Sequence, residues 1–460
     1  MSKHSKSASD IFHIAGVFAP VGLLAVIVGS AVLSWRTHSV ELQAVIRDVS
    51  NDGMALDRET LIRRHDAETS KDGVATWKAI LSAAQAHNVQ FGGPFIWAGQ
   101  DDESYEFVVP PGEPWEAGEI VHLYAEGAKP ILAKIETLLD SDHTIWTPLV
   151  GDSLSTLLPE VQQSRDVYRL LRYVFLDAIH QGDNETALMT IHAVDRLFGP
   201  KQRSMFMVGE FVNMSLYSSM LSDIRRSIAV DVWTDEQLAE IESLLAKPMQ
   251  WDQRWAAAIQ SETEMYLPAL VDGQIEPGQY DNEFPSQAFK LAPSTLVAFV
   301  RNQQQLKGMP AAFTEQDVRR IDEIYKNIVA QDGDAAIDRL LQLPLMSSEL
   351  MARFVKSSYM NAAGAFCRDA NAHRFTRTVL AVRKFERKFD LWPESLDELS
   401  RVGLPRLETQ AFDGGPFAME VDDESQMVVY DQARSTAVYE GLSNQPADWV
   451  QMIRSKKTDP

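Results

Sequence analysis

An apolar run near the start of the chain limits its architecture more than any other feature. The run covers residues 14–35, begins with Ile14, ends with Trp35 and contains no formally charged side chain. A helix rises about 1.5 Å per residue, so a run of this length crosses the hydrocarbon core of a bilayer. Its glycines and its single proline, Pro20, are tolerated in lipid, where a helical backbone satisfies its own hydrogen bonds. We therefore expect a transmembrane helix over residues 14–35 that contacts membrane lipid.

A cleaved secretory signal is the alternative explanation of the same run. Lys3 and Lys6 would form its basic start, and the small residues at 29–31 would lie near the cleavage site. The apolar run is longer than the core of a usual signal, however, and no A-x-A site follows it. A lipoprotein anchor is excluded because the only cysteine is Cys367.

The orientation of the expected span rests on a nearly even distribution of basic residues. Lys3 and Lys6 precede the run, and Arg36 and Arg47 follow it. The free amino terminus adds positive charge to the short side, and long domains are translocated largely regardless of their own charge. We expect a short cytoplasmic tail over residues 1–13 and a single-pass inner-membrane protein whose bulk is periplasmic or extracytoplasmic.

The remainder of the chain is strongly acidic. The full sequence has 43 Lys and Arg against 65 Asp and Glu, which gives a formal net charge of -22. Sequence-independent binding to nucleic acid needs a basic surface, so we expect no nucleic-acid partner. The sequence also lacks the HExxH, Walker A, Rossmann glycine and CxxC patterns, and we expect no cofactor.

Helical periodicity dominates the sequence after the apolar run. Helices of ten to twenty-five residues joined by short turns are typical of stacked antiparallel αα-hairpins. Pro130 should kink or split one of these helices, and Thr234 with Gln237 has the spacing of a capping box. The apolar spacing predicts helices over residues 120–139, 158–179, 186–198, 202–228, 235–245 and 252–266.

Changes in pattern divide the chain into successive parts. Residues 36–114 are predicted to hold juxtamembrane helices, one of them over 74–88, and an irregular loop with a lone strand at 105–109. Residues 115–270 form a helical-hairpin domain, and residues 271–390 form a second helical segment ending in a long helix over 347–389. Residues 391–460 form a small α+β module with a short helix over 393–400, Pro393 at its first position, and a β-hairpin of strands 417–421 and 427–430. The expected fold class is mainly α.

The C-terminal module resembles part of a known group of proteins. Residues 379–399, VLAVRKFERKFDLWPESLDEL, and residues 412–430, FDGGPFAMEVDDESQMVVY, resemble the C-terminal module of uncharacterised anchored proteins common in planctomycete bacteria. In those proteins a long helix, a W-P-x-S-L-x-E-L turn and a hairpin follow one another. Residues 168–197 are similar to their central helical region. The resemblance implies an envelope protein and implies no chemistry.

The terminal hairpin is also distantly similar to that of type II secretion pseudopilins. Residues 412–415 read Phe-Asp-Gly-Gly instead of the D-P-[FW]-G order, and the Gly- and Asp-rich loop that binds calcium in pseudopilins does not follow. A long helical body also separates the apolar run from the hairpin, unlike in a pilin subunit. A pseudopilin-like assembly subunit is therefore an alternative and not our main expectation.

One serine lies in a short motif of hydrolases. Residues 151–154 match the start of the GDSL esterases, in which the serine, here Ser153, is the nucleophile. Pro148 occupies a position where a central strand needs an N–H group, and the nearest downstream D-x-x-H, at Asp177 and His180, lies on a predicted helix. The alternative is a loop in which Asp152 or Ser153 caps the following helix. A hydrolase remains a rival hypothesis.

Four polar residues are spaced evenly about the predicted turn at 182–185. Asp177 and His180 lie three apart on one predicted helix, and His192 and Asp195 lie three apart on the next. If the two pairs faced each other across an antiparallel hairpin, they would supply a ligand set suited to zinc or iron. The alternative is that they are solvated positions at the flank of an apolar stripe, joined by His–Asp hydrogen bonds. A metal-dependent enzyme is a second rival hypothesis.

Basic residues gather at the end of the predicted long helix, against the acidic balance of the chain. Residues 368–388 hold seven Lys and Arg against Asp369 and Glu386. One interpretation is a solvated face paired with acidic neighbours, and the other is contact with anionic lipid or an acidic partner. Since no catalytic set is evident, we expect an interaction or structural role at the cell envelope, with another envelope protein as the partner.

Overall fold

The computed structural model describes part of the chain. It covers residues 70–91, 108–141, 159–199, 207–247, 349–409, 417–422, 426–431 and 450–453, together with isolated residues within 40–67 and 253–264. The chain divides into two compact units, one of residues 1–61, 151–155 and 263–306, and the other of residues 62–150, 156–262 and 307–460. Every element named below belongs to the second unit. The run at 14–35 lies outside the described residues, and among the described helices none is long and apolar enough to span a membrane.

Helices make up most of the described residues, as the sequence predicts. The helices are α3 (Lys71–Gln90), α4 (Gly118–Leu139), α5 (Pro159–Gln181), α6 (Asn184–Phe198), α7 (Met207–Ala229), α8 (Asp235–Leu245) and α13 (Glu349–Phe389). They are followed by the 3-10 helices η2 (Leu396–Val402) and η3 (Arg406–Thr409) and by the strands β1 (Phe417–Val421), β2 (Met427–Asp431) and β3 (Val450–Ile453). The mainly α class is confirmed.

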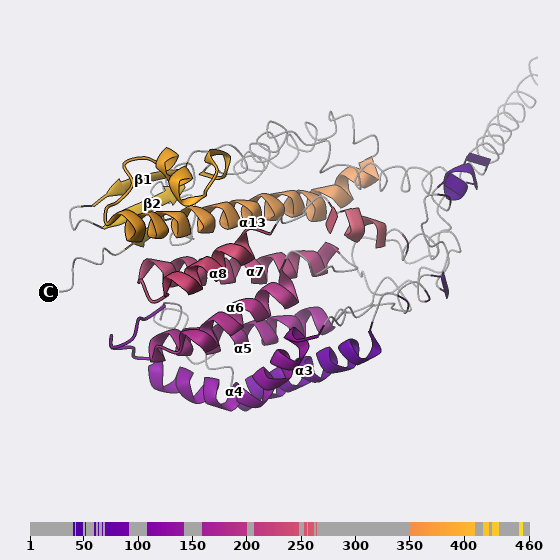
Figure 1. Cartoon of the computed structure of the whole chain (residues 1–460). Helices are drawn as coiled ribbons and strands as arrows, with labels where there is room; N and C mark the ends of the chain where they lie inside the picture. The colour runs from indigo at the N-terminus through magenta and orange to yellow at the C-terminus, as the bar shows by residue number, and fades with distance from the viewer. Residues whose placement is uncertain are drawn as a thin grey trace, which may run out of the picture. The chain divides into compact units, whose positions relative to one another are not determined.

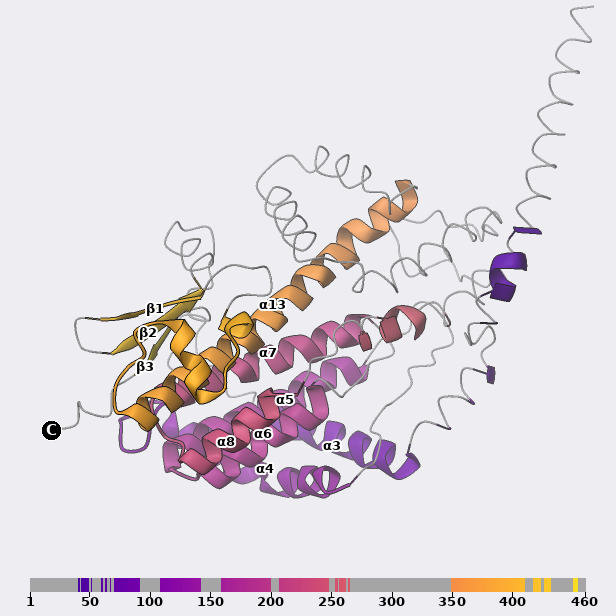
Figure 2. The ribbon, with the colours of Figure 1, turned by 45° about the horizontal axis from the view of Figure 1, so that its top comes forward.

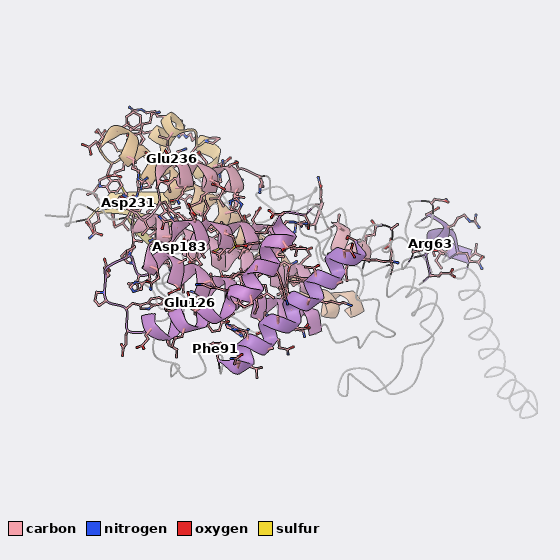
Figure 3. All side chains as sticks on the ribbon, turned by 60° about the horizontal axis from the view of Figure 1, so that its bottom comes forward. Arg63, Phe91, Glu126, Asp183, Asp231 and Glu236 are labelled. Carbon is pink, nitrogen blue, oxygen red and sulfur yellow. The ribbon has the colours of Figure 1, made fainter. Side chains whose placement is uncertain are left out.

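The helices of this unit stack in layers (Figure 1). α3 and α4 pack on each other and on α5, α5 pairs with α6, and α7 packs on both before α13 lies along α7 and α8. Figure 3 shows the same order in its labelled side chains, from Glu126 on α4 through Asp183 at the start of α6 to Asp231 and Glu236 near α8. The boundaries expected after residues 114 and 390 therefore fall inside one compact unit.

Side-chain caps and one glycine set the ends of the central hairpins. Gly182 adopts φ +73° in the turn between α5 and α6, a conformation open to glycine without strain. The Asp183 side chain then accepts a hydrogen bond of 3.1 Å from the Thr186 N–H. At α8, Thr234 and Gln237 exchange side-chain to backbone hydrogen bonds of 3.0 and 3.2 Å. The predicted capping box is confirmed.

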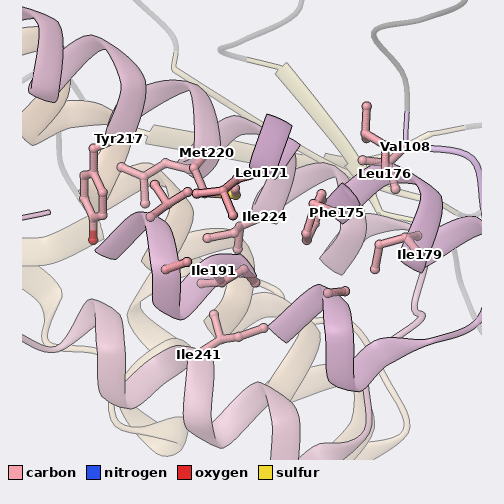
Figure 4. Packing of buried hydrophobic residues seen from close by; sticks show 14 of the residues in the cluster. Val108, Leu171, Phe175, Leu176, Ile179, Ile191, Tyr217, Met220, Ile224 and Ile241 are labelled. Carbon is pink, nitrogen blue, oxygen red and sulfur yellow. The ribbon is translucent and has the colours of Figure 1, made fainter. Parts of the chain in front are cut away.

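The core is centred on α5, which contacts helices on several sides. Leu171 and Phe175 of α5 point toward Ile191 of α6, Ile224 of α7 and Ile241 of α8 (Figure 4). All five side chains are almost completely buried. Burying each of them contributes about 1.5–3 kcal/mol relative to an exposed position. The apolar periodicity of the sequence thus converges on one cluster.

Three local expectations differ from the structure in whole or in part. The expected split at Pro130 is wrong, because α4 runs through Pro130, which is exposed, and the carbonyl that loses its N–H partner lies on the solvated side. A kink at Pro130 stays a prediction. The helix expected over 393–400 is instead the 3-10 helix η2, which Ser395 precedes, so Pro393 is not its first residue. Of the strand expected at 105–109, only Val108 and Val109 are described, and neither is in a strand.

The predicted β-hairpin exists but is part of a larger sheet. β1 and β2 pair antiparallel, with Phe417 opposite Asp431, and β3 pairs antiparallel with the other edge of β2 (Figure 2). The sheet covers the C-terminal half of α13, where the rings of Phe375 and Phe417 meet edge to face with centroids 5.2 Å apart. β3 has only four residues, too few for an alternating pattern to show in the sequence.

α7 is joined to its neighbours by buried polar groups as well as by apolar packing. Toward α5, the Arg172 Nε donates to Asp223 at 2.7 Å, and the Asp223 carboxylate is almost fully buried. Toward α13, the Arg225 guanidinium donates to the Thr376 hydroxyl at 2.9 Å and to the Ala372 carbonyl at 3.3 Å. α7 is therefore held on two sides by charged groups that the core encloses.

Arg383 on α13 makes the deepest of these polar contacts. Its side chain is fully buried and donates to the Ile228 and Ala229 carbonyls at 3.2 and 3.0 Å. These carbonyls lie in the last turn of α7, where they have no intrahelical donor and carry partial negative charge. The Glu386 carboxylate lies 3.2 Å from the guanidinium. We call this arrangement the Arg383 contact.

The other basic residues of this stretch bind carboxylates within the same unit. Arg387 donates to Asp231 and, at 2.6 Å, to Asp235. Lys384 donates to Glu242 of α8. The predicted pairing with acidic neighbours is confirmed for these two residues, whereas a solvated or lipid-facing position is wrong for Arg383.

We predict that Arg383→Ala lowers the free energy of unfolding by about 3–5 kcal/mol, because it leaves Glu386 buried without its partner and removes donors from the last carbonyls of α7. The neighbouring change Lys384→Ala removes a half-exposed ion pair and is expected to cost less than about 1 kcal/mol. Chemical denaturation of the full chain in detergent, followed by circular dichroism, measures both. Equal losses in the two variants would show that the Arg383 contact has no special weight.

Candidate functional site

An open groove lies between α6 and α8, beside the C-terminal end of α4. Its volume is about 550 Å³. Charged and polar side chains form much of its lining, and the remainder is apolar. The lining residues are Leu139, Leu188 and Met189, together with Glu185, His192, Asp195, Arg196, Glu240 and Lys247. Two of the residues that the sequence marks as possible metal ligands, His192 and Asp195, are therefore in this groove.

A histidine–carboxylate contact and an ion pair cross from α6 to α8 and its C-terminal end within the groove. His192 Nε2 lies 2.6 Å from Glu240 Oε1, and the Lys247 ammonium donates to Asp195 Oδ2 at 2.7 Å. The Asp195 side chain is 13% exposed and that of Glu240 is 49% exposed. The first pair is thus open to water, and the second is partly enclosed.

The positions of these residues follow from the helical period. Ile191 and Val194 of α6 are buried in the core, so His192 and Asp195 come to the side of the helix that faces α8. On α8, the buried Ile241 turns its neighbour Glu240 toward the groove in the same way. The apolar stripe on each helix therefore fixes which polar residues meet.

Asp177 and His180 lie away from the groove, against α4 and the residues before it. Asp177 is buried and lies 3.1 Å from His122 Nδ1 of α4. The His180 ring packs edge to face on Trp115, with centroids 5.2 Å apart. The two pairs expected to face each other thus point toward different helices.

This separation excludes the metal site that we proposed from the sequence. Asp177 and His180 turn toward the α4 side of α5, whereas His192 and Asp195 turn toward α8. Within the described ranges, no group of three or more His, Cys, Asp or Glu side chains could hold a metal ion. The expectation failed because equal spacing from a turn does not fix the rotation of either helix about its axis.

The structure does not test the serine of the hydrolase motif. Ser153 lies outside the described residues. Its role as a nucleophile or as a helix cap stays a prediction.

Sequence analysis missed the partners that complete the groove. Glu240 lies 48 residues after His192, and Lys247 lies 52 residues after Asp195. Neither distance corresponds to a motif, because the pairs form only when α8 folds back on α6. The one signal that could have pointed to them is the capping box at Thr234, which fixes the first residue of α8 and hence its facing residues.

Comparisons of the chain with protein-family models, with curated proteins and with solved structures found no match.

The groove combines paired charged groups with apolar side chains. The carboxylates of Asp195 and Glu240 are each engaged by a basic side chain. Between them, Leu188 and Met189 remain partly exposed. Partly exposed apolar side chains with a charged margin are typical of the surfaces that proteins use to bind one another.

We predict that the two polar pairs of the groove, His192–Glu240 and Lys247–Asp195, differ in strength. A double-mutant cycle with Asp195→Asn and Lys247→Met should give a coupling energy of about 1 kcal/mol, because the Asp195 carboxylate is partly enclosed. The matched cycle with Glu240→Gln and His192→Gln should give less than about 0.5 kcal/mol, because both side chains are more exposed. Urea denaturation of the full chain in detergent measures both cycles. The opposite order would contradict the assignment of Asp195 and Lys247 as the stronger pair.

Proposed function

We propose that the protein is a membrane-anchored interaction protein of the cell envelope whose helical body binds a partner protein. The groove between α6 and α8 is the binding surface. The observation that carries this proposal is the composition of the groove, in which Leu188 and Met189 are partly exposed while the neighbouring carboxylates are already paired. A partner that covers these apolar side chains gains hydrophobic free energy without having to break a buried ion pair.

The charges of the chain indicate the chemistry of the partner. The chain has a formal net charge of -22, and Glu185, Glu236 and Glu240 are exposed on α6 and α8. Like charges on two proteins slow their association, and opposite charges accelerate it. The partner segment is therefore apolar on one side, to cover Leu188 and Met189, and basic at its margin.

We predict that Leu188→Asp abolishes partner binding without unfolding the protein, because it places a charge in the apolar part of the groove. The matched control is Leu123→Asp on α4, at a side chain that is 57% exposed and outside the groove. The full-length chain, carrying a photo-crosslinking residue at Met189, is irradiated in native membranes, and the cross-linked product is identified by mass spectrometry. Circular dichroism spectra of the two variants verify their folding.

The expected result is one reproducible protein adduct in the unmodified and Leu123→Asp chains and at least a tenfold lower yield with Leu188→Asp. Absence of an adduct in the unmodified chain, or equal loss in both variants, would contradict the assignment of the groove. An adduct with a second copy of this chain would show that the groove mediates self-association and would contradict the proposal of a basic partner.

The membrane anchor is the second part of the proposed function. It is supported by the length of the uncharged run at residues 14–35 and by the resemblance of the C-terminal module to anchored envelope proteins. The short cytoplasmic tail and the exported bulk are supported by the translocation of long domains regardless of their charge. An anchor restricts the body to the membrane surface, where it meets other envelope proteins at a raised effective concentration.

We predict that deletion of residues 1–36 moves the protein from the membrane fraction to the soluble fraction, whether the shortened protein is exported or stays in the cytoplasm. The intact chain should resist extraction by high salt and dissolve only in detergent. External protease should degrade the body after the outer barrier is opened and before the inner membrane is breached. A mature amino terminus near residue 31, found by mass spectrometry, would instead establish the cleaved signal.

A further inference from the structure

The contact between α7 and α13 encloses a carboxyl group that makes no well-formed hydrogen bond. Asp369 on α13 is 2% exposed, and neither of its side-chain oxygens has a hydrogen-bond partner of good geometry. Buried polar groups in proteins are almost always hydrogen-bonded, and an ionised carboxylate costs much more to bury than a neutral carboxyl. The position of Asp369 therefore calls for an explanation.

One basic group that acts on Asp369 is also bound to another acid. Arg254 is buried, and its guanidinium lies 2.6 Å from the fully buried Glu210 carboxylate. Its charge also acts on Asp369. Arg254 thus lies near two buried acids, and a proton on Asp369 reduces the negative charge that the core encloses.

Two other titratable side chains described near Asp369 are neutral near pH 7. His373, one turn along α13, is also buried, and burial together with Arg377 lowers its pKa to about 3, so it is neutral near pH 7. Tyr217 of α7 is neutral as well, because burial and the charges of Asp195 and Asp369 raise its pKa. Burial raises the pKa of Asp369 to about 7, although Arg254 and the Ser218 hydroxyl act in the opposite direction.

Contacts farther along the same two helices do not depend on a titrating acid. Asp369, Thr376 and Arg383 follow one another at intervals of seven residues, which places them on one side of α13. Thr376 bonds to Arg225, and Arg383 bonds to the last carbonyls of α7. A change at Asp369 therefore affects one end of the contact while the other end stays bound.

We propose that Asp369 makes the contact between α13 and α7 sensitive to pH. With the carboxyl protonated the two helices pack closely at this level, and ionisation loosens them there while the Arg383 contact holds. The protein thereby has a local opening that responds to pH near neutrality.

The direction of the effect on stability follows from proton binding. Below pH 4 the carboxyl is protonated in the folded and unfolded chains alike, so the group does not affect the free energy of unfolding. Between about pH 4 and pH 7 the folded state holds the extra proton, and stability falls as pH rises. The loss is complete only once the pH lies above the pKa of the folded state.

The test compares the full chain in detergent with Asp369→Asn, which keeps the shape and removes the charge. Thermal midpoints are measured by circular dichroism from pH 4 to pH 8.5. The midpoint of the variant should equal that of the unmodified chain near pH 4 and exceed it by on the order of 5 °C above pH 7. Asp397→Asn, at a side chain that is 61% exposed, is the matched control and should show no such trend.

Hydrogen exchange measures the opening locally. If Asp369 had only a structural role, protection near it would not change with pH. After correction for intrinsic exchange rates, peptides around Asp369 should exchange several-fold faster at pH 8 than at pH 6, whereas peptides around Arg383 should not. Asp369→Asn should abolish the difference. If the variant fails to fold, hydrogen exchange in the unmodified chain still tests the proposal. Equal protection around Asp369 at pH 6 and pH 8 would overturn it.

Discussion

The packing of α13 depends on a guanidinium enclosed by protein. Arg383 occupies the C-terminal end of α7 and satisfies carbonyls that the helix itself cannot. A buried cation is stable only where several acceptors surround it, so α13 cannot slide along α7 without losing those bonds. The η2 and η3 helices follow α13 directly and pack on it, and the sheet covers it. Their position therefore depends in part on the Arg383 contact, and β3 also packs directly on α7.

The interface of α7 and α13 has a polar stripe as well as an apolar one. Thr376 contacts Leu221 and Arg225 of α7, and Arg383, one heptad later, contacts Ile228 and Ala229. Residues later in α13 therefore meet residues later in α7, so the two helices run parallel. Hydrophobic side chains would allow several registers that differ by one turn. Polar groups that match at only one register exclude the others, which is the established use of buried polar residues in coiled coils.

How far the sequence predicts this structure depends on the range of the interaction. Helices with a clear apolar period, the capping box of Thr234 and the β1–β2 hairpin depend on neighbours in the sequence, and all three were predicted. The burial of Arg383 was not, because a basic residue in the sequence carries no information about carbonyls 154 and 155 residues away. The same limit applies to the candidate site. His192 and Asp195 were recognised as unusual, but their partners became evident only from the packing of α6 on α8.

The long separation between α7 and α13 also bears on the order in which the protein folds. During synthesis α3 to α8 leave the ribosome well before Arg383 does, and closing so long a loop is slow compared with forming the local helical hairpins. The side of α7 that later receives α13 is therefore exposed in the nascent chain, which is the condition under which chains aggregate. Asp231, Asp235 and Glu242 border that side and repel one another until Arg387 and Lys384 arrive. The carboxylates that later fix α13 thus also oppose association of the unfinished chains, because like charges repel.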